Sequence, residues 1–454
     1  MSPAELHFTA EELISSGKAR WHEGKGSCVT GVFTDTRIPS PGALFIALAG
    51  EKFDAHNFLD KALSAGAAAL CIESAKIHLA PAGIPLLLTE NTLEFYQTLA
   101  NFHRRRFPGL KVFGITGSVG KTSVKEMLRA ICTAAAGSEE KVLWTLENTN
   151  NQIGVPQNLF RLNARHEYAV LEAGTNHFGE IAPLGRCIAP EVALVNSVAP
   201  CHLEFLRDLE GVAEEKSHIC DALLPGGTAV FPAQCPQLEI LKKNVHGKVM
   251  LFGSEKGDIC CTYLGGTLKG SRIKLTFPGN EEYTVEMPLS GAHQAMNAAA
   301  AATAAFAAGI APEKIAAGLA QTTLPGGRCK VYRAGEITVL DDTYNANPVA
   351  VSAALKNLKE FAVPEKTVLL LGEMRELGSA APAAHAEIQL LAEELFPEAR
   401  KIFVGSSYGE KAFPDSLSAA ETLKNILRPG DLLFAKGSRG VALEKILPPA
   451  DEVL

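Results

Sequence analysis

The segment from Lys111 to Ser123 constrains the fold of this 454-residue chain more than any other part of it. An apolar run at 112–115 predicts a buried strand, a glycine-rich turn follows it, and a helical pattern begins at Lys121. In this order the backbone N–H groups of the turn, together with the helix N-terminus, form an anion site. The motif departs from G-x-x-x-x-G-K-[ST] in having Ile115 at the first glycine position. The segment therefore predicts an α/β unit that binds a nucleoside triphosphate.

Two side chains of this loop have distinct predicted tasks. Lys121 is expected to reach the β- and γ-phosphates, and Thr122 is expected to offer its hydroxyl to Mg²⁺. The alternative is a glycine-rich turn that carries a surface lysine. The loop alone identifies no reaction, because unrelated activities use it. The full predicted cradle consists of Gly117, Ser118, Val119, Gly120, Lys121, Thr122 and Ser123.

Strand-like and helix-like runs alternate along most of the chain, which predicts an α/β fold in three domains. The basic stretch before Phe107 and the turn-rich linker at 323–327 suggest the boundaries. We expect a small N-terminal α/β domain at 1–105, a central P-loop domain with a parallel sheet at 106–324, and a Rossmann-like domain at 325–454. A helix is expected over 58–69, and hairpin-like strands are expected over 248–290.

The charge and the apolar pattern exclude several classes of protein. A net charge of −7 argues against a protein that wraps nucleic acid. The first residues do not resemble a signal peptide, and no run approaches the roughly 20 apolar residues of a membrane span. The 10 cysteines are scattered without a C-x-x-C pair, as expected for reduced thiols. We therefore expect a cytoplasmic protein without membrane insertion.

Polar residues follow two further predicted strands. Glu172 ends the strand that begins at Tyr168, and His202 lies shortly after the strand over 192–196. In a sheet whose first loop holds phosphate, a carboxylate at this edge is well placed to bind Mg²⁺ with Thr122. The alternatives are a glutamate in a surface loop and a hydrogen-bonded structural histidine. Lys216, taken alone, is typical of a solvated helix lysine.

Several strings, taken in order, resemble the Mur ligase family, the ATP-dependent amide-forming enzymes of peptidoglycan assembly, with folylpolyglutamate synthases as relatives. They cover nearly the whole chain. The strings are D-T-R at 35–37, T-G-x-x-G-K-T-S at 116–123, E-x-G-x-x-x-x-G-E-I at 172–181, G-x-H-x-x-x-N at 291–297, D-D-T-Y-N-A-N-P at 341–348, G-E-M-R-E-L-G at 372–378 and K-G-S-R at 436–439.

The resemblance implies a catalytic and metal site made of Lys121, Thr122, Glu172, His202 and Lys216, with ATP and two Mg²⁺ ions. In related ligases a lysine at the place of Lys216 carries a carbamate, which turns an ammonium into an anionic metal ligand. This chain has Glu-Glu-Lys where relatives often have Lys-Ala-Lys. Because free lysine is only about one part in a few thousand uncharged at neutral pH, the pocket would have to lower its pKa before CO₂ could add.

The resemblance also implies the contacts of the nucleotide and of the other substrates. The strings of the last domain suggest two cations and the N-terminus of the last helix beside a site for a dipeptide carboxylate. The nucleotide contacts implied are Asn297, Arg328, Asp342, Tyr344 and Asn345. The substrate contacts implied are Asp35, Thr36 and Arg37 for uridine, then Asn148, Thr149, Asn151, Lys436, Ser438 and Arg439.

The implied reaction joins D-alanyl-D-alanine to UDP-N-acetylmuramoyl-tripeptide through an acyl phosphate, in a protein expected to be a monomer. The string at 341–348 resembles that of the family member that adds D-alanyl-D-alanine, more than those of ligases that add one amino acid or glutamate. A P-loop kinase, a regulatory ATPase and a nucleotide-sensing protein without turnover are the alternatives from other classes. For these, the set of Glu172, His202 and Lys216 would be a coincidence.

Overall fold

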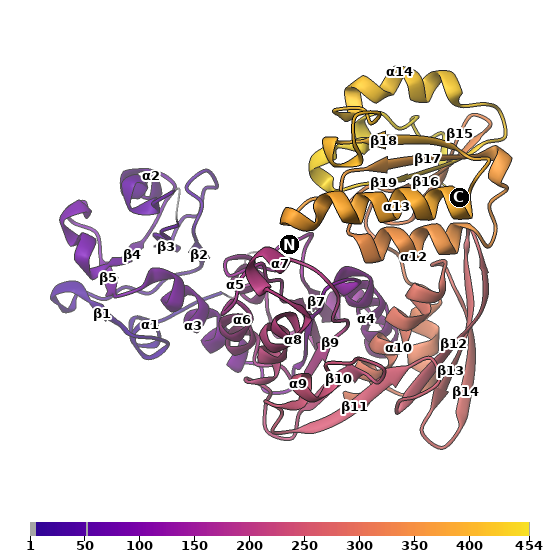
Figure 1. Ribbon diagram of the computed structural model, residues 1–454. Helices are drawn as coiled ribbons and strands as arrows, with labels where there is room; N and C mark the ends of the chain where they lie inside the picture. The colour runs from indigo at the N-terminus through magenta and orange to yellow at the C-terminus, as the bar shows by residue number, and fades with distance from the viewer. Residues whose placement is uncertain (1–5, 51–52, 454) are drawn as a thin grey trace.

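The computed structural model describes residues 6–50 and 53–453, which form three separate β-sheets flanked by helices. Figure 1 shows the three parts, with the first at the left, the second in the middle and the third at the upper right. The sheets take their strands from residues 19–89, 111–287 and 330–453. The predicted α/β class is confirmed, and the domain boundaries stay predictions. Among the described helices, none combines the length and the apolar character needed to cross a bilayer.

The first sheet has the order β1-β5-β4-β3-β2, and β1 alone in it runs antiparallel to its neighbour. Helices α1 and α3 pack on one face and α2 packs on the other. The expected helix over 58–69 is shorter than predicted, because a turn with Gly66 at φ +98° ends it and Ala69 already belongs to β4. The strands are β1 (Ala19–Trp21), β2 (Val32–Phe33), β3 (Leu44–Ile46), β4 (Ala69–Glu73) and β5 (Leu86–Thr89); the helices are α1 (Ala10–Ser15), α2 (Leu59–Ser64) and α3 (Thr92–Arg105).

The second sheet has the order β14-β13-β12-β11-β10-β9-β6-β8-β7 and is parallel from β7 to β12. Strands β12 to β14 form the expected antiparallel hairpins. The chain order reverses at β6, which lies between β8 and β9, and ligands bind at such a switch point. The strands are β6 (Lys111–Thr116), β7 (Val142–Trp144), β8 (Tyr168–Glu172), β9 (Val192–Val195), β10 (Thr228–Pro232), β11 (Lys248–Gly253), β12 (Ile259–Thr267), β13 (Gly270–Phe277) and β14 (Glu281–Met287).

Helices cover both faces of this sheet and bury two apolar clusters. Helix α10 brings a run of fully buried alanines, which form helix readily and let it approach the strands closely. It shares its face with α4 and α11, while α5, α6 and α8 cover the other face. The helices are α4 (Lys121–Ala136), α5 (Gly154–Leu159), α6 (Ile181–Ile188), α7 (Leu203–Leu206), α8 (Leu209–Ser217), α9 (Leu238–Lys242), α10 (Ala292–Ala307) and α11 (Pro312–Leu319).

The third sheet has the order β18-β17-β19-β16-β15-β20, with parallel pairing from β18 to β16 and antiparallel pairing at β15 and β20. Helices α12 and α13 pack on one face and α14 packs on the other. The strands are β15 (Lys330–Ala334), β16 (Ile337–Asp342), β17 (Thr367–Gly372), β18 (Arg400–Val404), β19 (Leu432–Lys436) and β20 (Glu452–Val453); the helices are α12 (Pro348–Leu358), α13 (Ala381–Leu395) and α14 (Ser416–Ile426).

A buried arginine ties helix α3 to the second sheet. Arg104 is only 3% exposed, and its Nη2 donates to both carboxylate oxygens of Glu191 at 2.8 and 3.0 Å. The same guanidinium donates to the carbonyls of Ile188 and Ala189. Oε2 of Glu191 in turn accepts the backbone N–H of Val112, the second residue of β6. The strand that leads into the glycine-rich loop is therefore anchored to α3.

We predict that Arg104→Ala lowers the local opening free energy of α3 by about 3 kcal/mol, because it leaves the Glu191 carboxylate without its charged partner. Hydrogen exchange of peptides that cover α3 measures this energy. Arg105→Ala is the matched control, because Arg105 is exposed and should change the same energy by less than about 0.5 kcal/mol. Equal protection in the two variants would contradict the anchoring role.

Candidate active site

One cavity of about 1150 Å³ is lined by residues from all three parts of the chain. It lies at the carboxyl ends of β6, β8 and β9, where the switch point of the second sheet places it. Ala49 and Leu93 come from the first part, the glycine-rich loop from the second, and Arg328, Tyr344 and Arg439 from the third. The site therefore exists only where the three parts meet.

The glycine-rich loop turns from β6 into α4, as predicted, and glycine is required at its last position. Gly120 has φ +83°, in the left-handed region that disfavours other residues. A Cβ atom there would lie 2.5 Å from Oδ1 of Asn297 and 2.6 Å from Nδ2 of Asn196. The loop leads directly to the N-terminus of α4, whose first N–H groups have no partner within the helix. This arrangement can hold an anion.

Lys121 opens α4, and its Nζ donates to the carbonyl of Gly117 at 2.6 Å. Burial lowers the pKa of Lys121, and the charge of Glu172 opposes this effect. The lysine therefore lies within the loop that it was predicted to complete.

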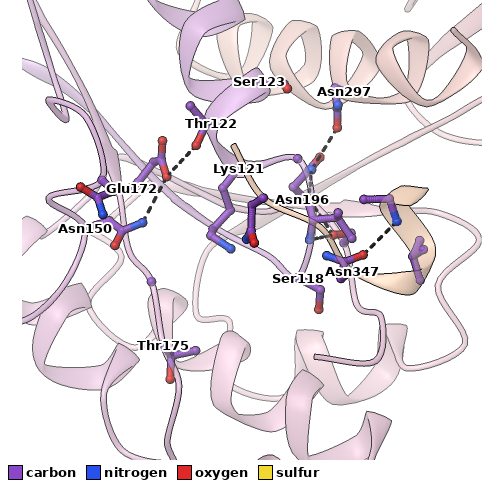
Figure 2. A pocket seen from close by; sticks show the side chains of 18 of the residues that line it. Ser118, Lys121, Thr122, Ser123, Asn150, Glu172, Thr175, Asn196, Asn297 and Asn347 are labelled. Carbon is purple, nitrogen blue, oxygen red and sulfur yellow. Dashed lines mark hydrogen bonds between the residues drawn. The ribbon is translucent and has the colours of Figure 1, made fainter. Parts of the chain in front are cut away.

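Two residues that sequence reasoning missed hold this loop in place. Nδ2 of Asn196 donates to the carbonyl of Val119 at 2.8 Å and to Oδ1 of Asn297 at 3.1 Å. Ser197 accepts the N–H of Val119 on its Oγ at 2.9 Å. Figure 2 shows Asn196 between the loop and Asn297. Their position directly after β9, the neighbour of β6, was the available signal.

Glu172 meets the requirements of a cation ligand. It is 1% exposed at the end of β8, and its Oε2 accepts from Thr122 Oγ1 and from Asn150 Nδ2, each at 3.4 Å. Figure 2 shows these two side chains converging on it. Its Oε1 is buried without a hydrogen-bond partner, and the ammonium of Lys125 is 3.9 Å away. A buried carboxylate oxygen without a donor is costly unless a cation approaches it.

His202 lines the same cavity as Glu172, Lys216 is not among the lining residues, and both His202 and Lys216 have perturbed pKa values. Lys216 is 1% exposed on α8, which argues against a solvated lysine. Burial and, to a smaller extent, the charge of Lys121 lower the pKa of Lys216 to about 8. Burial lowers the pKa of His202, the charge of Glu376 opposes this effect, and the charges of Lys216 and Lys121 add to it.

No group of three His, Cys, Asp or Glu side chains with metal-ligand spacing occurs within 6–50 and 53–453. A metal here would therefore need the Thr122 hydroxyl, a carbamate on Lys216 or phosphate oxygens as further ligands.

The departure from the family string beside Lys216 has a structural role. Glu215 is 1% exposed and accepts the N–H groups of Gly179, Glu180 and Ile181 at 2.7, 3.0 and 2.7 Å. It thereby caps the N-terminus of α6 and joins that helix to α8, which carries Lys216. A carboxylate at this place satisfies three backbone donors, which alanine cannot do.

The predicted residues of the third part are brought together, although some of them pair with one another. Arg328 lies over the ring of Tyr344 at 3.8 Å, and its Nε is buried without a partner. Nζ of Lys436 donates to Asp342 and to the carbonyl of Asn345. Arg439 is exposed and reaches over the same tyrosine ring at 5.2 Å.

One expectation about this region is wrong. The K-G-S-R string is followed by two short 3-10 turns at Arg439–Val441 and Leu443–Lys445, so no helix N-terminus faces a carboxylate there. Ser438 is 5% exposed, and its Oγ accepts the N–H of Arg375 at 3.0 Å. The string closes a loop instead of opening a helix.

The predicted substrate contacts of the first two parts differ in how far their polar groups remain free. Asn148 and Asn151 line the cavity, although Oδ1 of Asn151 also caps the start of α5. Thr149 donates to the carbonyl of Leu146. Arg37 forms a bidentate pair with Asp35 and lowers the pKa of that carboxyl to about 2; Thr36 separates the two residues in the sequence. The functional roles of all these residues stay predictions.

The chain is similar to known proteins over most of its length. A family profile described as the Mur ligase middle domain matches residues 115–305, and one described as the Mur ligase glutamate ligase domain matches residues 327–439. The chain is 35% identical to the UDP-N-acetylmuramoyl-tripeptide–D-alanyl-D-alanine ligase of Escherichia coli over 445 residues, with 95% of each chain covered.

Two solved structures show the same likeness in three dimensions. A crystal structure of MurF from Acinetobacter baumannii has a TM-score of 0.89 and 32% identity, with 98% of each chain covered. A MurF ligase from Thermotoga maritima in complex with ADP has a TM-score of 0.79 and 25% identity, with 91% of this chain and 95% of that chain covered. This extent of similarity excludes an unrelated P-loop kinase or regulatory ATPase, and the chain belongs to the Mur ligase family.

Proposed function

We propose that this chain is an ATP-dependent carbon–nitrogen ligase of peptidoglycan precursor synthesis. It joins D-alanyl-D-alanine to the terminal carboxylate of UDP-N-acetylmuramoyl-tripeptide, as the relatives' names describe. The observation that carries the proposal is the cavity at the carboxyl edge of the second sheet. It combines an anion-binding loop, a buried carboxylate with a partnerless oxygen, and cationic side chains from the third part.

The chemistry that these residues support is activation of a carboxylate, which is a poor electrophile. Phosphorylation by ATP would convert it to an acyl phosphate, and attack by the dipeptide amine would then form the amide bond and release phosphate. Lys121 and the loop N–H groups would hold the phosphates and stabilise charge on the transferred phosphoryl group. Two Mg²⁺ ions, held by Thr122, Glu172, His202 and carbamylated Lys216, would neutralise further phosphate charge.

The three parts of the chain would then have separate tasks. Residues 1–105 would hold the uridine through Asp35, Thr36 and Arg37, and residues 106–324 would bind ATP. Residues 325–454 would place Arg328 against the phosphates and Arg439 near the dipeptide carboxylate. A site assembled from three parts can close around an acyl phosphate and keep water from hydrolysing it.

The remaining contacts in this proposal follow the same division. Asn297, Asp342, Tyr344 and Asn345 would contact the nucleotide. Asn148, Thr149, Asn151, Lys436 and Ser438 would contact the peptide substrates or hold their surroundings. We also place the protein in the cytoplasm, where nucleotide-linked precursors are available, and as a monomer, because all three parts of the site come from one chain.

The decisive measurement is phosphate release by the purified protein with ATP and Mg²⁺. We expect release only when UDP-N-acetylmuramoyl-tripeptide and D-alanyl-D-alanine are both present, with the pentapeptide product seen by mass spectrometry. Release that does not depend on the dipeptide would contradict the proposal and indicate another ligase or an ATPase. Nucleotide binding without release under any condition would indicate a binding protein.

We predict that Lys121→Ala lowers kcat by about 10²–10³-fold, because a preorganised charge beside the transferred phosphoryl group is lost. The matched control is Lys141→Ala, since Lys141 pairs with Glu167 away from the cavity and both side chains are well exposed. Steady-state rates of product formation check both variants. A Lys121→Ala enzyme as active as the control would exclude the predicted role of this lysine.

We predict that a carbamate forms on Lys216 and that its occupancy rises between pH 6.5 and pH 8. Only the neutral amine adds CO₂, and a pKa of about 8 leaves about one lysine in ten neutral at pH 7 and about half at pH 8. The carbamate carbon would appear in the ¹³C spectrum of protein equilibrated with labelled bicarbonate.

Two variants locate this carbamate. Lys216→Arg should lack the signal. Lys125→Arg should keep it, because Lys125 is equally buried but pairs with Glu126. A missing signal in the wild type at pH 8, or a signal that survives in Lys216→Arg, would refute the assignment.

A further inference from the structure

Two loops meet where the third part of the chain contacts the second. Oε2 of Glu376, in the G-E-M-R-E-L-G string, lies 3.3 Å from Nδ1 of His202, at the start of α7. Beside this pair, a Cβ atom on Gly378 would lie 3.8 Å from Cβ of Glu204. Glu376 and His202 both line the cavity. A carboxylate from one part thus faces the imidazole of another at the candidate metal site.

Both residues of this pair have an unusual backbone conformation. His202 has φ +49° and Glu376 has φ +65°, in the left-handed region that residues other than glycine rarely adopt. Such conformations cost free energy and persist where the surrounding structure imposes them, often at functional sites. Each backbone directs its side chain toward the contact between the two parts.

The loop that carries Glu376 is held by two hydrogen bonds from its backbone. The N–H of Met374 donates to Nε2 of His385 at 2.8 Å, and the N–H of Arg375 donates to Oγ of Ser438 at 3.0 Å. His385 is completely buried, and Nδ1 of its ring lies 2.6 Å from the carbonyl of Ala381. These bonds position Glu376, whose side chain is 68% exposed.

The contact between Glu376 and His202 has the form of a carboxylate beside a metal-bound histidine. A histidine that binds a cation through one ring nitrogen usually donates the N–H of the other to a carboxylate, which fixes the tautomer and raises the ligand's basicity. Nδ1 of His202 faces Glu376, which leaves Nε2 to bind a cation. We propose that Glu376 is a positioning residue for His202, so that docking of the third part strengthens divalent-cation binding at this histidine.

This inference rests on the proposed metal role of His202, and it couples cation binding at His202 to docking of residues 325–454. If docking of residues 325–454 strengthens cation binding, then cation binding must stabilise the docked arrangement by the same factor. The cation site would then be complete only while the three parts enclose the substrates. That order would favour acyl-phosphate formation inside a closed site.

The test is the affinity of the full-length protein for Mn²⁺ in the presence of ADP, measured by electron paramagnetic resonance of the free ion. Glu376→Gln keeps the size of the side chain and removes its charge. We expect it to raise the Kd for Mn²⁺ by about 10-fold or more, the effect of losing a carboxylate partner of a metal-bound histidine. Because the side chain is largely exposed, this variant should fold normally.

Glu204→Gln is the matched control, because Glu204 is an exposed acid at the same contact that does not reach His202. It should leave the Kd for Mn²⁺ within about twofold of the wild type if the specific pair matters rather than nearby negative charge. Equal weakening in the two variants would overturn the proposal, and so would a Glu376→Gln affinity equal to that of the wild type.

A double variant and the ligase assay separate this proposal from the function on which it rests. In His202→Ala, adding Glu376→Gln should change the Kd no further, because the carboxylate acts through the imidazole. A full further 10-fold loss would show that Glu376 acts independently and would overturn the inference. If wild-type protein forms the pentapeptide but His202→Ala binds Mn²⁺ as tightly as wild type, the ligase function stands and the positioning role fails.

Discussion

The close approach of the glycine-rich loop to the end of β9 and to α10 is the contact on which the rest of the site depends. At Gly120 there is no room for a methyl group, because Asn297 and Asn196 occupy that space. The hydrogen bonds of Asn196 and Ser197 to Val119 give the loop one shape. That shape aims the N-terminus of α4 into the cavity, where Lys121 and Thr122 begin the helix. The alanines of α10 allow this approach, since a larger side chain would hold the helix away from the sheet.

Charged groups buried around this loop are too costly to be explained by stability alone. Glu172 has one oxygen without a donor, the pKa of Lys216 is lowered to about 8, and burial together with the positive charges of Lys216 and Lys121 lowers the pKa of His202. An unpaired buried charge destabilises a folded chain. Such groups are typical of sites that bind charged ligands, and a nucleotide with its cations would supply the missing partners. By contrast, the buried carboxylate of Glu215 has three backbone donors, which fits a structural role.

The third part of the chain completes the site through contacts that are small and polar. Glu376 faces His202, Tyr263 on strand β12 donates a hydrogen bond to Glu360, and Asn357 donates one to Ser290. Polar contacts of this kind between domains allow relative motion, whereas a large apolar interface would prevent it. The same contacts can therefore hold the parts together in a substrate complex and release them afterwards.

The sequence by itself determined the α/β class, the phosphate loop, the sheet edge that carries Glu172 and His202, and the family. Those conclusions follow from local order along the chain, because a strand, a glycine turn and a helix in succession leave few geometries. Only the tertiary structure decided which polar groups remain free. It showed that the ammonium of Lys436 pairs with the carboxylate of Asp342, and that the hydroxyls of Ser438 and Thr149 form hydrogen bonds with backbone groups. It also showed that short turns follow the K-G-S-R string, where a helix was expected. The structure further showed that Asn196 holds the glycine-rich loop, that Glu215 caps α6, and that Glu376 faces His202. Hydrogen-bond partners far apart in the chain depend on how separate elements pack, and a linear pattern does not contain that information.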